Sequence, residues 1–149
     1  ASGPGAGAPR HPLGIPLFKP PFSRITAIDM NTGEHAWVIP TGETPARVQE
    51  VIDDNNLDVE NTGTGALVPM VVTPSMLVYS DTRTDGTPML YAVDKSTGET
   101  VGSIEVPDRS RYGMSSWTHD GHQYIMLQTG SKLTAVALPA AKPAETGYH

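Results

Sequence analysis

Two pairs of side chains have the residue types and the close spacing of a metal site. His119 and His122 flank an Asp-Gly turn, but two histidines without a third ligand bind a metal weakly. Asp81 and Asp85 show part of the spacing of a calcium loop, although Arg83 stands where that loop needs an oxygen donor. An exposed hairpin turn explains each pair better than a metal site does.

Two further segments contain reactive residue types. Residues 115–120 include two serines, a histidine and an aspartate, but no Gly-x-Ser-x-Gly turn surrounds a nucleophile, and the histidine and aspartate are adjacent. A serine hydrolase is therefore disfavoured. The segment 41–66 is acidic and could bind cations or a basic electron acceptor, although a solvated loop explains it more simply. The candidate side chains there are Asp53, Asp54, Asp58 and Glu60.

The composition excludes several classes of function. The chain of 149 residues has 10 basic and 16 acidic side chains and no basic cluster, so we expect no nucleic-acid partner. No stretch approaches the roughly 20 apolar residues that a membrane-spanning helix needs. The absence of cysteine excludes disulfides and thiolate chemistry within the chain. With 15 glycines and 14 prolines, the composition favours many short strands joined by turns.

An internal repeat predicts the elements that would position a site. Residues 25–34 read Ile-Thr-Ala-Ile-Asp-Met-Asn-Thr-Gly-Glu, and residues 90–99 repeat them as Leu-Tyr-Ala-Val-Asp-Lys-Ser-Thr-Gly-Glu. A third, partial copy lies at residues 133–138. Each copy is a short apolar strand that runs into a turn, and the second and third copies are about one propeller blade apart. The repeat therefore predicts a β-propeller.

The predicted fold is all-β. It is a partial β-propeller with slightly more than two four-stranded antiparallel blades. Strands are expected near residues 23–29, 35–39, 67–72, 76–80, 89–94, 100–106, 114–118, 123–128 and 132–138. The segment 41–66 is expected to be a long loop with room for one helical turn near residues 45–51.

This pattern divides the chain into three parts. Residues 22–139 form the propeller part, preceded by an extended arm at residues 1–21 and followed by a flexible tail at residues 140–149. Each blade of a propeller buries its apolar face only against its neighbours. We therefore expect the chain to need further blades, either as the C-terminal part of a longer polypeptide or as one chain of a complex.

The first copy of the repeat carries a resemblance to a known family. Residues 27–37 have the pattern A-x-D-x-x-T-G-x-x-x-W, which resembles the tryptophan-docking motif of quinoproteins, the dehydrogenases that use pyrroloquinoline quinone (PQQ). Residues 16–29 look like the start of the C-terminal part of membrane-bound glucose dehydrogenases, and residues 106–125 resemble the last blade of that family. The resemblance implies a larger, eight-bladed quinoprotein propeller. Gly102 departs from it, because the second copy lacks the tryptophan there, so we expect one weaker contact between blades.

The resemblance also implies where a cofactor would bind. The family holds PQQ and Ca²⁺ mainly through an aspartate base, a lysine and calcium ligands in earlier blades, and none of these has a counterpart in this chain. The part of the pocket that the family forms in this region is the loop that enters a blade, which corresponds here to Thr64, Gly65, Ala66 and Leu67. Glycine permits close approach of a ring to the backbone, although a flexible strand entry explains Gly63 and Gly65 more simply.

The function that the resemblance implies is oxidation of a sugar or alcohol with PQQ, with electrons passing to ubiquinone or a cytochrome. Its expected location is the periplasm. A non-enzymatic propeller that uses the same repeat as a protein-binding scaffold is the alternative, because a fold does not dictate a function.

Overall fold

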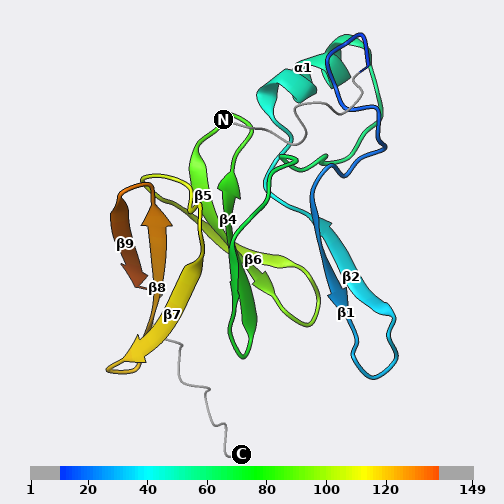
Figure 1. The fold of residues 1–149 in the computed structure, drawn as a ribbon. Helices are drawn as coiled ribbons and strands as arrows, with labels where there is room; N and C mark the ends of the chain where they lie inside the picture. Colours follow the sequence, from blue (N-terminus) through cyan, green and yellow to red (C-terminus); the bar gives the residue numbers. More distant parts are fainter. Residues whose placement is uncertain (1–10, 138–149) are drawn as a thin grey trace, which may run out of the picture.

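The computed structural model describes residues 11–137, which form three antiparallel sheets (Figure 1). The first sheet pairs β1 (Arg24–Ile28) with β2 (His35–Pro40). The second has the order β3 (Met70–Val72), β4 (Met76–Thr82), β5 (Pro88–Asp94) and β6 (Thr100–Glu105). The third has the order β7 (Met114–His119), β8 (His122–Thr129) and β9 (Lys132–Ala137). The predicted all-β class and the predicted partial propeller are confirmed.

The predicted N-terminal arm and the C-terminal tail are only partly within this description. Residues 1–10 of the arm and the whole tail at 140–149 lie outside the described residues. The described part of the arm approaches the loop region, because Arg47 Nη1 donates to the Gly14 carbonyl at 3.0 Å and Phe22 N donates to the Thr62 carbonyl at 2.7 Å. The arm therefore contacts the segment between β2 and β3.

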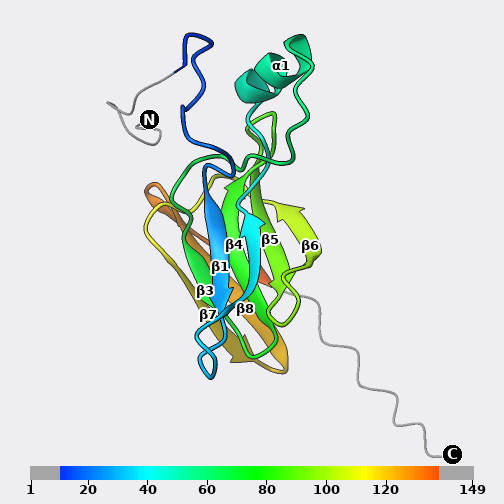
Figure 2. The ribbon, with the colours of Figure 1, turned by 90° about the vertical axis from the view of Figure 1, so that its right-hand side faces the viewer.

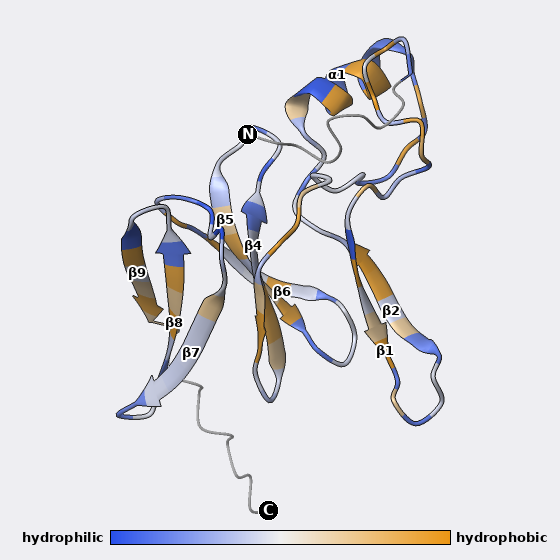
Figure 3. Ribbon diagram, in the orientation of Figure 1, coloured by the Kyte–Doolittle hydropathy of each residue, from blue (hydrophilic) through white to orange (hydrophobic). Residues whose placement is uncertain are grey.

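The three sheets stack face to face. Figure 1 shows them next to one another, and in Figure 2, after a rotation of 90°, they lie one behind another. Figure 3 shows hydrophobic residues along β2 and the lower part of β4, whereas the tip of β4 and parts of α1 are hydrophilic. Loops and the helix gather at one end of the stack, so any site built from several sheets forms there.

Two apolar layers hold the sheets together. The layer between the first and second sheets contains Ile25, Leu77, Tyr79, Met89, Tyr91 and Val93, with Trp37, Ile39 and Val68 packed against it. The layer between the second and third sheets contains Val78, Leu90, Val106, Ile125 and Leu127. Residues alternate between the two layers along β4 and β5, as the two-residue period of a strand requires. The two central strands of the second sheet, β4 and β5, are therefore buried on both faces, whereas β6 at its edge is exposed.

The segment between β2 and β3 contains more helix than the sequence predicted. Helix α1 (Ala46–Asp54) has nine residues, whereas a single turn within a loop was expected. Val48 and Ile52 are four positions apart and are only 5% and 6% exposed, so one face of the helix is buried. The expected helical turn near residues 45–51 is therefore longer than predicted, because the acidic residues on the other face dominate the composition of this segment, whereas residues 55–69 form no helix or strand.

The internal repeat is confirmed by the strand register. Ala27 pairs with Trp37 across β1 and β2, and Ala92 pairs with Gly102 across β5 and β6. The register shifts directly after the alanine in both hairpins. The first two copies thus share their bulge as well as their sequence, and Gly102 occupies the position that is equivalent to Trp37.

The turns of the two copies also share their hydrogen bonds. Asn31 N donates to Asp29 Oδ1 at 2.8 Å, and Ser96 N donates to Asp94 Oδ1 at 2.7 Å. Gly33 N and Gly98 N each donate to the carbonyl of the aspartate, at 2.7 and 2.9 Å. An aspartate that accepts backbone N–H groups in this way stabilises a tight turn. The aspartate of each copy therefore stabilises the turn of its hairpin.

Trp37 connects the first hairpin to the turn of the second. Its Nε1 donates to the Lys95 carbonyl at 3.0 Å, and its ring covers Gly98. A Cβ on Gly98 would lie 2.8 Å from Trp37 Cδ2, and the φ of Gly98 is +80°. Gly33 has a similar φ of +76° but has no atom within 4 Å of such a Cβ. Within residues 11–137, therefore, an aromatic ring covers the second turn but not the first.

The outer faces of the first and third sheets carry exposed apolar side chains. Val38 on β2 is 45% exposed, and Leu133 on β9 is 69% exposed. Trp117 stacks on Tyr124 with ring centroids 5.3 Å apart, yet Trp117 is 41% exposed. These side chains are exposed on the outer faces of the two outer sheets.

The two glycines provide a matched test of the Trp37 contact. Replacing either with alanine places a Cβ at positive φ, which costs about 1–2 kcal/mol. Gly98→Ala should cost a further 1–3 kcal/mol or so, because its Cβ clashes with the Trp37 ring. Denaturant unfolding of both variants measures this difference. Equal destabilisation by Gly98→Ala and Gly33→Ala would contradict the contact.

Candidate functional site

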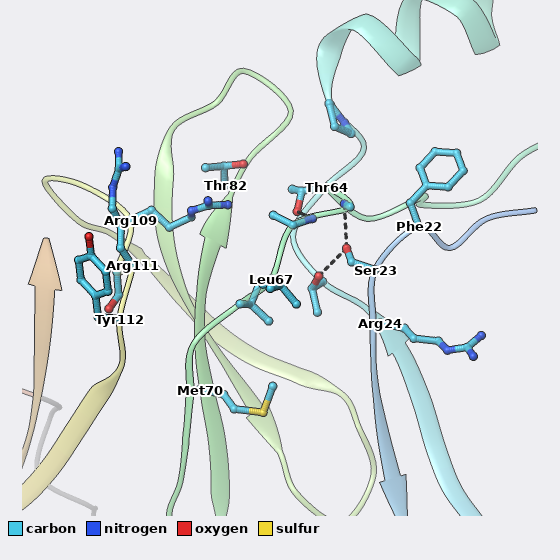
Figure 4. Close-up of a pocket in the computed structure, with 16 residues that line it drawn as sticks. Phe22, Ser23, Arg24, Thr64, Leu67, Met70, Thr82, Arg109, Arg111 and Tyr112 are labelled. Atoms are coloured by element: carbon cyan, nitrogen blue, oxygen red, sulfur yellow. Dashed lines mark hydrogen bonds between the residues drawn. The ribbon is translucent and has the colours of Figure 1, made fainter. Parts of the chain in front are cut away.

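A groove of about 1110 Å³ opens at the loop end of the sheets (Figure 4). One side is formed by the residues that begin β1, including Phe22 and Ser23. The segment 64–68 before β3 lies in the middle, and the loop 109–112 before β7 forms the other side. The groove is thus lined by residues of the first two sheets and by the loop that leads into the third, and its lining combines apolar and cationic side chains.

The four residues predicted to contact a cofactor all line this groove. Thr64, Gly65, Ala66 and Leu67 follow one another along its middle. Gly65 is buried, whereas Leu67 has 96% of its surface exposed. An apolar side chain this exposed beside a groove offers a surface on which a flat ring can pack. Cofactor binding by these residues remains a prediction.

A network of hydroxyl groups fixes the conformation of this segment. Ser23 Oγ accepts hydrogen bonds from Thr41 Oγ1 at 2.7 Å and from Gly65 N at 2.9 Å. Thr64 N donates to the Thr41 carbonyl at 3.0 Å. Gly63 has a φ of +67°, and a Cβ there would lie 2.7 Å from the Ser23 carbonyl oxygen. Glycine is therefore required at this close approach of two chain segments.

Asp81 is a buried carboxylate at the end of β4, behind the groove lining. Its side chain has no exposed surface. Oδ2 accepts a hydrogen bond from Thr64 Oγ1 at 2.8 Å, and Oδ1 accepts from Thr82 N at 2.9 Å and from Arg109 Nη1 at 3.5 Å. Burial raises the pKa of Asp81 above its usual value of 3.8, although the hydrogen bonds act in the opposite direction. Asp81 thus connects the middle of the groove to the loop before β7.

The loop 109–112 was not identified from the sequence as part of a site. Arg109, Arg111 and Tyr112 line the groove on the side opposite Phe22 (Figure 4). Arg109 and Arg111 are separated by a single residue, in a chain that is acidic overall. This local concentration of positive charge is a sequence signal that could have indicated the loop. Their place beside the segment 64–68 depends on the stacking of the sheets, which the sequence pattern does not specify.

The other candidate residues do not form sites. His119 Nε2 lies 3.4 Å from Asp120 Oδ2, but both side chains are largely exposed. Asp85 Oδ1 accepts a hydrogen bond from Thr87 N at 2.9 Å, as expected for a turn. Within residues 11–137 no group of three or more histidine, cysteine, aspartate or glutamate side chains could hold a metal ion. Asp53, Asp54, Asp58 and Glu60 are exposed.

Three stacked antiparallel sheets with a groove at their loop end define a part of a β-propeller. The family model for the β-propeller domain of PQQ-dependent glucose/ethanol/alcohol dehydrogenases matches residues 5–125. The chain therefore belongs to this quinoprotein family, and the resemblance noted in its sequence is confirmed. No solved structure is a significant match to the chain.

Two characterised relatives illustrate the range of the family. The chain is 28% identical over 121 residues to the glycerol dehydrogenase large subunit of Gluconobacter thailandicus. It is 60% identical over 126 residues to the quinate/shikimate dehydrogenase (quinone) of Acinetobacter baylyi. These alignments cover 78% and 79% of this chain but only 15% and 14% of the two relatives. The chain thus spans about one seventh of the length of these proteins.

Burial of Asp81 makes a prediction for the pH dependence of stability. Because its pKa is raised on folding, the free energy of unfolding should fall as pH rises from 3.8 through the raised value. Asp81→Asn cannot titrate and therefore lacks this fall. As pH rises, the free energy of unfolding of the variant should increase relative to that of the unaltered protein, by about 1.4 kcal/mol per unit of pKa shift. Urea unfolding between pH 3 and 7 measures the difference.

Asp85→Asn is the control for this measurement. Hydrogen bonds from Thr87 lower the pKa of Asp85, so the stability that Asp85 contributes is present above pH 3.8 and is lost in acid. The variant should therefore lose stability relative to the unaltered protein as pH rises. If the difference in the free energy of unfolding between Asp81→Asn and the unaltered protein is the same at every pH in this range, the raised pKa of buried Asp81 is contradicted.

Proposed function

We propose that this chain forms part of a PQQ-dependent dehydrogenase that oxidises a hydroxyl group of an alcohol or sugar. The observation that carries the proposal is the groove in which the predicted cofactor loop 64–67 meets the loop 109–112, in a member of the quinoprotein family. Electrons would pass on to ubiquinone or a cytochrome. PQQ, when bound, supplies a two-electron acceptor that the side chains of a protein lack.

The residues of the groove suit a flat, anionic aromatic ligand such as PQQ. Leu67 offers exposed apolar surface, and the adjacent backbone is held by Ser23 and Thr41. Arg109 and Arg111 supply positive charge at one side. In this proposal the chain binds and orients the ring, while the catalytic base and the ligands of a calcium ion come from residues outside residues 11–137.

We further propose that the remaining blades of a propeller cover the outer sheets. The uncovered turn at Gly33 supports this, because the equivalent turn at Gly98 is covered by Trp37 from the neighbouring hairpin. In the proposed assembly a tryptophan of a preceding blade would dock on Gly33 in the same way. Exposed Val38 and Leu133 would then become buried.

The periplasm is the proposed location, since that is where enzymes of this kind meet their electron acceptors. Within residues 11–137 no helix is long and apolar enough to cross a membrane. The names of the relatives offer two kinds of substrate, a neutral polyol in glycerol dehydrogenase and hydroxy acids in quinate/shikimate dehydrogenase.

Dye reduction by the complete protein tests the dehydrogenase. With PQQ and Ca²⁺ added, we expect reduction of an artificial acceptor by at least one alcohol, aldose or hydroxy acid, and none without PQQ. A complete protein that binds no PQQ and oxidises none of these substrates would favour the scaffold alternative instead.

Leu67 allows a test of the groove itself. Leu67→Asp removes apolar contact and places a carboxylate near a ligand that carries carboxylates, so the affinity of the complete protein for PQQ should fall about tenfold, or about 1.4 kcal/mol. The matched control is Leu57→Asp, because Leu57 is 43% exposed but does not line the groove. Fluorescence titration with PQQ measures both affinities. Equal affinities of the two variants would contradict the assignment of the segment 64–67.

A further inference from the structure

We propose that Asp81 is a positioning residue of the cofactor groove, and that its carboxylate acts through the Thr64 hydroxyl to set the conformation of the segment 64–67. Asp81 lies behind the groove and is not one of the residues that line it. The inference rests on the proposed binding of PQQ to this segment. It implies that a change at Asp81 lowers the affinity for PQQ although Asp81 does not touch the ligand.

Two hydrogen bonds in series connect Asp81 to the backbone of the segment. Thr64 Oγ1 donates to Asp81 Oδ2 at 2.8 Å, and the same oxygen accepts a hydrogen bond from Ala66 N at 3.3 Å. A hydroxyl group has one hydrogen and two lone pairs. Because the hydrogen is used by the carboxylate, a lone pair of the Thr64 oxygen is left to accept from Ala66. Asp81 therefore orients the hydroxyl group that holds the Ala66 backbone.

The hydrogen bonds of the Asp81 side chain all have the carboxylate as acceptor. In addition to Thr64, the donors are Thr82 N at 2.9 Å and Arg109 Nη1 at 3.5 Å, both to Oδ1. A carboxylate accepts on both oxygens, whereas an amide has one accepting oxygen and one donating nitrogen. In Asp81→Asn the NH₂ group must face one side of this arrangement. It either meets the donors at the Oδ1 position or turns the hydrogen of the Thr64 hydroxyl away.

The contact between Asp81 and Thr64 is enclosed by the chain. The Asp81 side chain has no exposed surface. Gly42 has a φ of +64°, and a Cβ there would lie 2.7 Å from Thr64 Cγ2 and 2.9 Å from Asp81 Cγ. A buried polar group that loses its partner cannot replace it with water, so the loss is not compensated. The effect of a substitution should therefore reach the segment 64–67.

Leu67 follows this hydrogen-bonded turn directly. Because 96% of its surface is exposed, its place in the groove depends on the backbone of residues 64–66 rather than on the packing of its own side chain. A segment that is already held in its binding conformation pays a smaller entropy cost when a ligand binds. Loss of the hydrogen bond at Ala66 should therefore weaken ligand binding without removing a ligand contact.

Fluorescence titration of the complete protein with PQQ tests the role of Asp81. Asp81→Asn should lower the affinity about fivefold, the effect of one hydrogen bond, and so should Thr64→Val, which keeps the shape of the side chain but lacks the hydroxyl. Thr64→Ser retains the hydroxyl and should bind PQQ like the unaltered protein. The matched control is Thr73→Ala, because buried Thr73 accepts a hydrogen bond from Met76 N at 3.0 Å but does not line the groove. This variant should keep its affinity for PQQ.

The double variant Asp81→Asn/Thr64→Val tests whether the two residues act as one unit. If Asp81 acts through the Thr64 hydroxyl, the double variant should bind PQQ no more weakly than the weaker single variant. Additive losses would overturn the inference. So would an unchanged affinity in Asp81→Asn, or equal affinities of Thr64→Val and Thr64→Ser. The comparison of these last two variants decides the matter if Asp81→Asn fails to fold.

Hydrogen exchange in the complete protein without PQQ separates this inference from the proposed function. The Ala66 amide should exchange about fivefold faster in Asp81→Asn and in Thr64→Val, and at an unchanged rate in Thr64→Ser and Thr73→Ala. An unaltered protein that binds no PQQ would contradict the proposed function. Unchanged exchange at Ala66 in Asp81→Asn and Thr64→Val would instead refute the positioning role of Asp81, whether or not PQQ binds.

Discussion

The structure depends on the burial of both faces of its central sheet. Alternate residues of β4 and β5 point into two apolar layers, one shared with the first sheet and one with the third. Trp37 adds a specific contact to the first layer by covering Gly98 and donating to the Lys95 carbonyl. Because a sheet of two or three strands is marginal alone, this stacking stabilises the outer sheets and sets their positions relative to the central one. The groove forms where the loops of the stacked sheets come together.

The groove joins segments that are far apart in the sequence. Asp81 at the end of β4 accepts hydrogen bonds from Thr64 and Arg109, which lie on different loops. The burial of this carboxylate and the hydroxyl network of Ser23 and Thr41 hold the lining in one conformation. This lining, together with an exposed Leu67 and the positive loop before β7, is the basis for the proposed binding of an anionic ring.

The sequence predicted the elements with local signals and missed those that depend on packing. The strands and the Thr-Gly turns were predictable because alternation of apolar residues and the repeated aspartate act within a few positions. The helix at residues 46–54 was predicted only as a single turn near residues 45–51, since the burial of Val48 and Ile52, which supports its full length, depends on packing. The segment 64–67 was predicted through the family resemblance. Arg109 and Arg111 were not, because no local pattern shows that their loop meets that segment.

The central claim is that the stacked sheets are propeller blades and that their groove contacts the cofactor. A structure of the complete protein determined with PQQ bound tests this claim most directly. The account predicts the quinone ring against residues 64–67, with Trp37 still covering Gly98 and further blades over the outer sheets. A quinone bound elsewhere in the propeller, with residues 64–67 exposed to solvent, would contradict it.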